Sequence, residues 1–468
     1  MTSKSPFYSS ADARVAAGSG PARRACYSEI RFPLQAEQSS RSVVLTQSES
    51  TIHRIRTGFS PVFWTANILE LFERLAFYGS KAVLSFYLAN KIGLDLPSVG
   101  WLIGMFAGLT WSLPIVAGVF VDRYGFKRTL AACFAFFSLG YFLIGLGGMP
   151  AGEAIMASTG KIGYMAAVLI LTAAGGSLIK PCIVGAVERT SNPDYRALGF
   201  SIYYALVNLG GAIGPILATM IRSELGIEYV FVMSAATSAL LLGGTLLFFR
   251  EPEGAAAQGQ GRSFGKVFGD MLLVFRNARF VGFLVIFSGF WIMFWQIFYS
   301  LPFYIDEVLG FKRFEILETV DAWTIILLSV PLTAFARKMR AMNAMTLGFL
   351  IASASWLIMA WSQTVWASIA ALFIFAIGEA LQAPRFYEYV GRLAPRDQVG
   401  TFMGFAFLPI AIGSFIAGRL GTWLVEHFIR FDRRPAEMFY IVAGIGFVST
   451  VLLYLYDRLF APPEPESL

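Results

Sequence analysis

The stretch GVFVDRYGFKR, residues 118–128, lies between two long apolar segments and carries charges of both signs. Gly118 removes a side chain where helices can approach closely, and Gly125 suits a tight turn. Asp122 stands near a helix end, where neighbouring groups can cap it or pair with it. The basic residues of the stretch are Arg123, Lys127 and Arg128. Such a loop can hold neighbouring helix ends together through its charges. The alternative is a solvated turn whose charges only set topology.

The composition around this loop is that of a polytopic membrane protein. The chain has 468 residues, of which 56% are hydrophobic and 14% are charged. A soluble domain of ordinary composition has about 25% charged residues. The net charge of +7 is better explained by membrane topology than by nucleic-acid binding. We expect the lipid bilayer as a partner, and no nucleic acid.

Twelve apolar segments are each long enough to cross about 30 Å of hydrocarbon as a helix. They are 60–90, 98–121, 128–148, 163–188, 198–221, 229–249, 279–306, 316–336, 343–362, 367–391, 400–427 and 437–460. The expected organisation is a disordered cytoplasmic tail (1–58), a six-helix bundle (59–249), a cytoplasmic linker (250–278), a second six-helix bundle (279–460) and a cytoplasmic tail (461–468).

Basic residues support one orientation of these helices. Lys and Arg are about twice as frequent in the loops on the linker side as in the opposite loops, which the positive-inside rule assigns to the cytoplasm. The cluster Arg430–Arg434 runs against this bias. An even number of helices places both termini in the cytoplasm. We therefore expect an integral protein of the plasma (cytoplasmic) membrane.

The loop also matches a known signature. Its Gly, Asp, Arg and Lys positions resemble the pattern G-x-x-x-D-R-x-G-x-[KR]-R of the major facilitator superfamily, at Gly118, Asp122, Arg123, Gly125, Lys127 and Arg128. The resemblance implies an all-α membrane protein with 12 transmembrane helices in two six-helix bundles. It implies a conformational role for the loop rather than contact with substrate: the loop would latch the cytoplasmic side of the two bundles and release when they rock.

The first apolar segment carries charges that a lipid-facing helix avoids. Within LELFERLAFYGSKAVLSFYL, residues 69–88, stand Glu70, Glu73, Arg74 and Lys81. Each would cost roughly 2.5–3.5 kcal/mol at the centre of a spanning helix. Their spacing places them on one helical face, which must line the bundle interior or a wet cavity. The alternatives are a cluster of ion pairs that holds helices together and a cavity that handles protons and charged solutes.

This segment resembles the motif E-x-x-E-R-F-x-Y-Y-G-x-R-A of the proton-dependent oligopeptide transporters, the POT family. Glu70, Glu73, Arg74 and Tyr78 match, and Lys81 stands in place of an arginine. Five later segments resemble the family as well: GGSLIKPC, FSIYYALVNLGG, FWIMFWQ, AIGEALQAP and RLAPRDQVGTFMG. They supply Lys180, Tyr204, Asn208, Trp291, Gln296 and Glu379.

The resemblance implies a proton-coupled symporter that takes up di- or tripeptides, or related small zwitterions, by alternating access. It implies a peptide carboxylate at Arg74 and Lys180 and a peptide amine at Glu379. The residues expected to couple protons are Glu70, Glu73, Arg74 and Glu379. Those expected to bind substrate are Arg74, Tyr78, Lys81, Lys180, Tyr204, Asn208, Trp291, Gln296, Glu379 and Arg385. We expect a monomer with protons and a small peptide-like solute as partners, and neither a cofactor nor a metal.

Two departures from the family pattern, and one proline that the pattern shares, bear on this site. Trp295 stands where the family has an acid facing the helix-four lysine, so we expect Lys180 to lose its partner. Arg385 adds a charge near Glu379, and the two could instead form a structural pair. Pro181 directly follows Lys180 and is expected to interrupt that helix.

Other functions remain open on the sequence alone. A superfamily member that moves organic anions or drugs would suit Trp295 and Arg385. A nutrient-sensing receptor that binds without transporting would suit a Lys180 that has no partner. Enzyme activity has little support, because there is no Ser/His/Asp order, metal-ligand spacing or phosphate loop. The histidines, His53 and His427, lie in presumed tails or loops.

Overall fold

The first long helix, α3 (Pro61–Phe86), shows how the sequence starts its helices. The side chain of Ser60 accepts a hydrogen bond from the backbone N–H of Phe63 at 3.3 Å, and Pro61 takes the first helical position. Pro97, Pro114, Pro409 and Pro435 occupy equivalent early positions in later helices. Proline needs no N–H partner at these positions, so it marks the first residues of helices whose starts hydropathy alone does not locate.

The computed structural model describes residues 58–192, 195–252, 274–394 and 399–460, with Gly265, Gly269 and Leu272 between them. The first half consists of α3, continued by a π-helical turn η1 (Tyr87–Lys91), then α4 (Leu96–Ser112), α5 (Pro114–Tyr124), α6 (Phe126–Gly147), α7 (Pro150–Thr159), α8 (Lys161–Thr190), α9 (Arg196–Glu224) and α10 (Glu228–Phe248). The expected tails, and most of the expected linker, lie outside the described residues.

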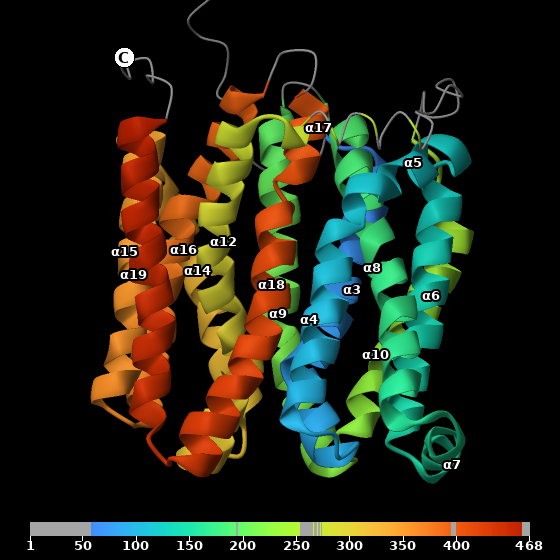
Figure 1. The fold of residues 1–468 in the computed structure, drawn as a ribbon. Coiled ribbons are helices and arrows are strands. Elements are labelled where there is room, and N and C mark those ends of the chain that lie inside the picture. The colour runs from blue at the N-terminus through green and yellow to red at the C-terminus, as the bar shows by residue number, and fades with distance from the viewer. Residues whose placement is uncertain are drawn as a thin grey trace, which may run out of the picture. The chain divides into compact units, whose positions relative to one another are not determined.

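The second half consists of α12 (Ala278–Tyr299), α13 (Leu301–Phe303), η4 (Tyr304–Val308), α14 (Phe314–Ala336), α15 (Ala341–Trp361), α16 (Val365–Leu393), α17 (Val399–Phe405), α18 (Leu408–Leu424), η5 (Val425–Phe431) and α19 (Pro435–Leu459). Figure 1 shows the long helices side by side, with α5 and α17 at one end and α7 at the other.

The predicted all-helical membrane fold is confirmed. Over the described residues, ten helices are long and apolar enough to cross a membrane. The pair α4 and α5, bent by 48°, makes an eleventh candidate span. The remaining predicted segment is α3, whose 26 residues are long enough to span but carry the charged stripe. Each of the twelve predicted segments therefore has a helical counterpart, and α7 was not anticipated.

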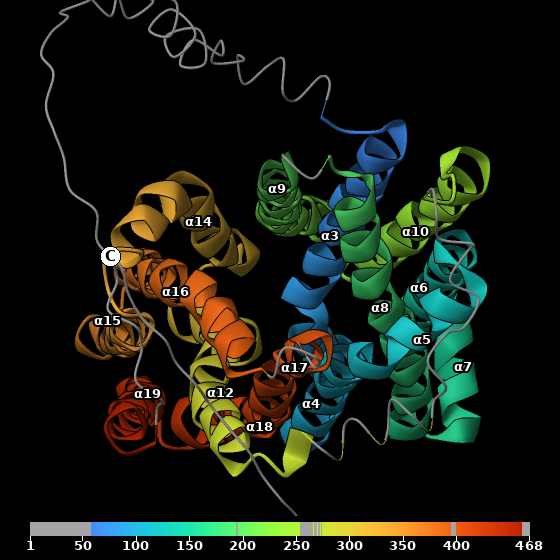
Figure 2. The ribbon, with the colours of Figure 1, turned by 90° about the horizontal axis from the view of Figure 1, so that it is seen from above.

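The two halves meet along two helix pairs. In Figure 2, α4 lies beside α18 and α9 lies near α14. Glycines allow the first of these approaches: a Cβ at Gly418 would lie 2.5 Å from the carbonyl oxygen of Gly100, and one at Gly104 would lie 2.8 Å from that of Phe415. Small residues at such positions let membrane helices pack backbone to backbone. At Gly118, by contrast, an added Cβ would meet no atom within 4 Å, so the close approach expected there is not seen.

The helix α8 is continuous through Pro181, which corrects the expected interruption. Proline removes one backbone donor, but membrane helices tolerate this where neighbouring groups satisfy the freed carbonyl. Lys180 is therefore held on a regular helix.

At one end of the molecule, side chains join the two halves. We call it the closed end; it holds Lys91 and Phe314. Ser85 Oγ donates a hydrogen bond to the carbonyl oxygen of Phe298 at 2.8 Å, and Phe86 packs against the rings of Phe303 and Phe314. The Arg222 guanidinium is ion-paired with the Glu315 carboxylate. These contacts tie α3 and α9 of the first half to α12, α13 and α14 of the second.

The opposite end, which we call the linker end because α10 finishes and α12 begins there, has partly exposed tyrosines near Glu379. Tyr204 on α9 is 44% exposed and Tyr387 on α16 is 38% exposed. Both tyrosines interact electrostatically with Glu379. Their partial exposure contrasts with the buried contacts that join the halves at the closed end.

The basic residues that oppose the topology bias lie at the closed end beside acids. Arg430 pairs with Glu307 at 2.7 Å, and Lys312 pairs with Asp306 at 3.1 Å. Pairing reduces the effective positive charge of this end, although the positive-inside rule counts only Lys and Arg.

Candidate functional site

The charged stripe of α3 forms a buried network with α8 and α9. Lys180 Nζ donates hydrogen bonds to Glu70 Oε1 at 3.2 Å and to the Tyr203 hydroxyl at 2.7 Å. Arg74 Nε lies 3.4 Å from the same Glu70 oxygen and donates to the Glu73 carboxylate. Buried charges need such partners because removal from water is costly. The two acids and two bases of this network balance each other.

This network corrects the expectation that Trp295 leaves Lys180 without a partner. Lys180 takes its acid from α3 instead, at Glu70, because α8 packs directly beside α3. In the family pattern the partner stands on helix seven. The contact with Glu70 depends on how two distant helices pack, which no local pattern reveals.

Lys81, the last charge of the stripe, sits among aromatic rings. Its Nζ lies 3.4 Å from the centroid of the Phe298 ring and 4.2 Å from that of Trp295. The rings of Tyr78 and Phe294 follow at 5.1 Å and 5.2 Å. Among the residues that the structure describes, Lys81 makes no hydrogen bond or ion pair. Lys81 is therefore held by cation–π contacts with these rings and not by an ion pair with a described residue.

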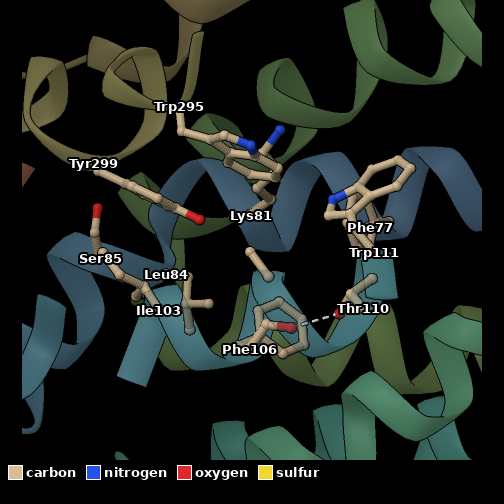
Figure 3. A pocket seen from close by; sticks show the side chains of 11 residues that line it. Phe77, Lys81, Leu84, Ser85, Ile103, Phe106, Thr110, Trp111, Trp295 and Tyr299 are labelled. Carbon is tan, nitrogen blue, oxygen red and sulfur yellow. Dashed lines mark hydrogen bonds between the residues drawn. The ribbon is translucent and has the colours of Figure 1, made fainter. Parts of the chain in front are cut away.

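The space beside Lys81 is small. Lys81, Trp295 and Tyr299 help to line a cavity of about 10 Å³ between α3, α4 and α12, which is room for roughly one water molecule. Figure 3 shows the Lys81 nitrogen next to the Trp295 ring, with the Tyr299 hydroxyl directed toward the same space. A solute larger than water has no room on this side of Lys81.

Three carboxyl groups of the second half complete the site. Glu318 and Asp321 lie on α14, Glu379 lies on α16, and all three interact electrostatically with Lys81. Neither carboxyl oxygen of Glu318 has a hydrogen-bond partner among the described residues. One oxygen of Asp321 and one of Glu379 are likewise buried without a partner.

The sequence reasoning missed Glu318 and Asp321. The available signal was two acids three residues apart in an otherwise apolar segment, which places them on one helical face. With them, the charged groups that interact with the stripe of α3 or belong to it are five carboxyl groups and three basic groups: Glu70, Glu73, Glu318, Asp321 and Glu379, against Arg74, Lys81 and Lys180. The excess of acid lies in the second half.

The other predicted binding residues are placed unequally. Tyr78 and Tyr204 lie near Glu379, and Asn208 donates a hydrogen bond to the Tyr204 carbonyl oxygen at 2.8 Å. Trp291 packs against Gly413 of α18 and on the Phe294 ring.

Gln296 and Arg385 are engaged in contacts within the second half. Gln296 is fully buried and donates to the carbonyl oxygens of Ile292 and Ala417, which fastens α12 to α18. Arg385 is bonded to Glu388 and, at 2.7 Å, to the carbonyl oxygen of Met339. In this conformation neither side chain joins the charged cluster.

The loop at 118–128 has the turn that was expected and a cap that was not. Gly125 adopts a φ of 81°, in the left-handed region that favours glycine. The Glu251 carboxylate, just after α10, accepts hydrogen bonds from the backbone N–H groups of Phe126 and Lys127 at the start of α6. The Arg123 guanidinium lies over the Tyr124 ring at 5.5 Å. Asp122 and Arg128 are exposed, and neither forms an ion pair within the described ranges.

Comparison with known proteins adds a family to this geometry. The model of the major facilitator superfamily matches residues 67–318 and 313–468. The chain belongs to the major facilitator superfamily. It is an integral membrane transporter rather than an enzyme, and the fold implied by the loop signature is the one observed.

Relatives within the superfamily include curated drug-resistance proteins. The chain is 24% identical over 403 residues to the multidrug resistance protein MdtH of Sodalis glossinidius, which covers 84% of this chain and 93% of that protein. It is 23% identical over 397 residues to MdtH of Edwardsiella ictaluri, covering 83% and 92%.

Solved structures with the same fold include peptide transporters of the POT family. One, in complex with 5-aminolevulinic acid, superposes with a TM-score of 0.70 at 18% identity and covers 85% of this chain and 96% of that one. Another, a POT transporter in complex with a thioalcohol-conjugated peptide, gives a TM-score of 0.69 at 18% identity, with 85% and 96% covered. At such identities the likeness concerns the fold. The resemblance to the POT family is therefore supported at the level of architecture.

Proposed function

We propose that this superfamily member is a proton-coupled symporter that moves small solutes carrying an amine, di- and tripeptides first among them, by alternating access. The observation that carries the proposal is the division of the buried site between the halves. A balanced ion-pair network lies on α3, α8 and α9, and an excess of carboxyl groups lies on α14 and α16. A solute that binds both groups would bridge the two halves.

The amine of the solute would bind among the acids of the second half. Glu379 and Asp321 are half-buried, and each has an oxygen without a hydrogen-bond partner in the described residues. An ammonium group satisfies such oxygens and offsets their mutual repulsion. Tyr78 and Tyr204 supply neutral contacts beside them.

A carboxylate on the solute would have to compete with the protein's own acids. Arg74 and Lys180 are already bonded to Glu70 and Glu73. A proton on Glu73 would weaken its bond to Arg74 and free the guanidinium for the solute. Binding and protonation would thus favour each other, which is the requirement for symport.

The conformation fits the inward-facing stage of such a cycle. We place the linker end and both termini on the cytoplasmic side of the inner membrane, following the positive-inside rule. Arg222 with Glu315, and Ser85 with Phe298, then close the outer side. Each proton that enters with the membrane potential supplies about 2.3 kcal/mol per 100 mV.

Uptake into liposomes tests this function. Labelled di- and tripeptides should accumulate when an inward proton gradient is imposed, and a protonophore should abolish the accumulation. Glu379→Gln should reduce uptake strongly, whereas Glu437→Gln, an exposed acid paired with Arg434 at the closed end, should leave it unchanged.

Export of amine-bearing drugs is a second candidate. Two observations favour it: the relatives named as multidrug resistance proteins, and the aromatic wall of Phe294, Trp295 and Phe298 beside the acids. A thermal-shift screen of dipeptides against cationic drugs and organic anions separates the candidates. The peptide proposal predicts stabilisation by dipeptides, and drug export predicts stabilisation by cationic drugs alone.

A further inference from the structure

Glu318 is a buried acid that the proposed cargo contacts do not use. Its exposed fraction is 4%, and neither carboxyl oxygen is hydrogen-bonded to a described residue. An ionised carboxylate in such a place has no hydrogen bond or ion pair with a described residue to offset the cost of removing it from water. A protonated, neutral carboxyl removes most of that penalty. The geometry therefore suits a Glu318 that carries a proton in this conformation.

Lys81 is the basic group that interacts with Glu318, yet the two do not pair. Glu318 interacts electrostatically with Glu315 on its own helix and with Lys81 on α3. Lys81 is 7% exposed and turns its ammonium to the α12 rings instead. Since Phe294, Trp295 and Phe298 belong to the second half, this contact holds α3 against α12 near the closed end.

We propose that Glu318 and Lys81 form a proton-operated switch between the two halves. With a proton on Glu318, Lys81 stays in the aromatic site and the closed end is held shut. When the Glu318 O–H bond breaks and the proton passes to water, the carboxylate draws the Lys81 ammonium away from the α12 rings. The α3–α12 contact is lost and the closed end loosens. The proton exchanged in each step is that of Glu318.

The surrounding charges leave Lys81 as the basic group that can move to Glu318. The charged and titratable groups around the two are Glu315 and Asp321 from α14, Glu379 from α16, Arg74 and Tyr78 from α3, and Tyr299 from α12; Arg222 from α9 contacts Glu315. Glu315 is already bonded to Arg222, and Arg74 to Glu70 and Glu73. Lys81 is thus the basic group of this set that has no acid partner, and it is the one able to move to Glu318.

The switch rests on the proposed proton symport and gives it a direction. A proton bound from outside would shut the outer side, and its release to the cytoplasm would let that side reopen.

Double electron–electron resonance on the full-length protein tests the switch without requiring transport. Spin labels at Asn90→Cys and Arg313→Cys report the closed end, after Cys26, Cys133 and Cys182 are replaced by alanine. The proposal predicts a short distance at pH 5 and a growing population of longer distances at pH 8. Glu318→Gln, which mimics the protonated acid, should keep the short distance at both pH values.

Matched variants distinguish the switch from a general loosening of the helices. Lys81→Met should lose the pH response and lengthen the distance at pH 5, and Glu318→Asp should keep the response. Glu315→Gln breaks the neighbouring pair with Arg222 and should lengthen the distance at both pH values while preserving the response. Monodisperse elution of each variant confirms folding.

Two results would overturn the switch. One is an unchanged pH response in Glu318→Gln. The other is a label-to-label distance that does not respond to pH in the labelled protein that keeps both Glu318 and Lys81. A normal response together with no peptide uptake would instead overturn the proposed cargo and leave the switch standing.

Discussion

At the residue scale, the acids and bases of α3 stabilise one another as a network with Lys180. Glu70 bonds both Lys180 and Arg74, so it is the residue on which the network depends. Glu70→Ala leaves two buried cations to share Glu73 and should lower the free energy of unfolding by about 3–5 kcal/mol, as for other buried pairs that lose one partner. Thermal unfolding in detergent measures this.

An exposed acid provides the control for that prediction. Glu437 pairs with Arg434 at 3.3 Å in a solvent-exposed position. Glu437→Ala should change stability by less than about 1 kcal/mol, because exposed pairs contribute little. Equal losses in the two variants would contradict the central place of Glu70.

The residue scale also shows where sequence reasoning stopped. The stripe Glu70, Glu73, Arg74 and Lys81 was predictable, since the cost of charge in lipid and the helical period specify one inward face. Its partners were not, because the contact of Lys180 with Glu70 depends on how α8 packs against α3. Glu318 and Asp321 were visible as charges in an apolar segment but fell outside the family motifs that guided the choice.

At the element scale, helix ends carry a prediction of their own. Asp95 Oδ2 accepts a hydrogen bond from the backbone N–H of Ser98 at 3.1 Å and caps α4. Its hydrogen bonds with Ser98 lower the pKa of this carboxyl. The cap therefore contributes stability above the unfolded pKa of aspartate, and the contribution is lost as the pH falls through the lowered value.

Substitution at Asp95 tests whether the stability contributed by this cap is lost as the pH falls. Asp95→Ala should destabilise α4 by about 1 kcal/mol at pH 7, the typical loss of an N-cap. Asp95→Asn keeps an acceptor oxygen and should retain most of the stability while losing the acid-dependent part. Hydrogen exchange of the first turn of α4 at pH 7 and pH 3 measures both; an acid-dependent loss that persists in Asp95→Asn would contradict the assignment.

Packing between α4 and α18 is the second prediction at this scale. A Cβ at Gly104 would lie 2.8 Å from a backbone oxygen of α18, so Gly104→Val should force the helices apart at a cost of typically 1–3 kcal/mol. Gly118→Ala meets open space and should be neutral or slightly stabilising. Similar melting temperatures for the two variants would rule out close packing at Gly104.

The helices themselves were the most predictable feature. Apolar length alone located all twelve segments. In lipid, a single segment can satisfy its own backbone N–H and C=O groups only by forming a helix, so a long apolar segment predicts a helix. The 48° bend between α4 and α5 was missed, although Pro114 follows it directly. The short α7 was missed because it is too short and too polar to register as a span.

At the scale of the whole molecule, sequence and architecture point to different relatives. The curated relatives include multidrug resistance proteins, whereas the solved structures of the same fold include peptide transporters. Both share one fold, and a fold accommodates many functions, so the site must decide. The excess of carboxyl groups on α14 and α16 favours a cargo with an amine, a property that dipeptides and cationic drugs share.

The most direct test of the account is gradient-driven uptake by the purified protein in liposomes. An inward proton gradient should drive accumulation of a labelled di- or tripeptide, and Glu379→Gln should reduce it strongly. No gradient-dependent uptake across a broad panel of peptides, with the protein folded and correctly inserted, would contradict the account.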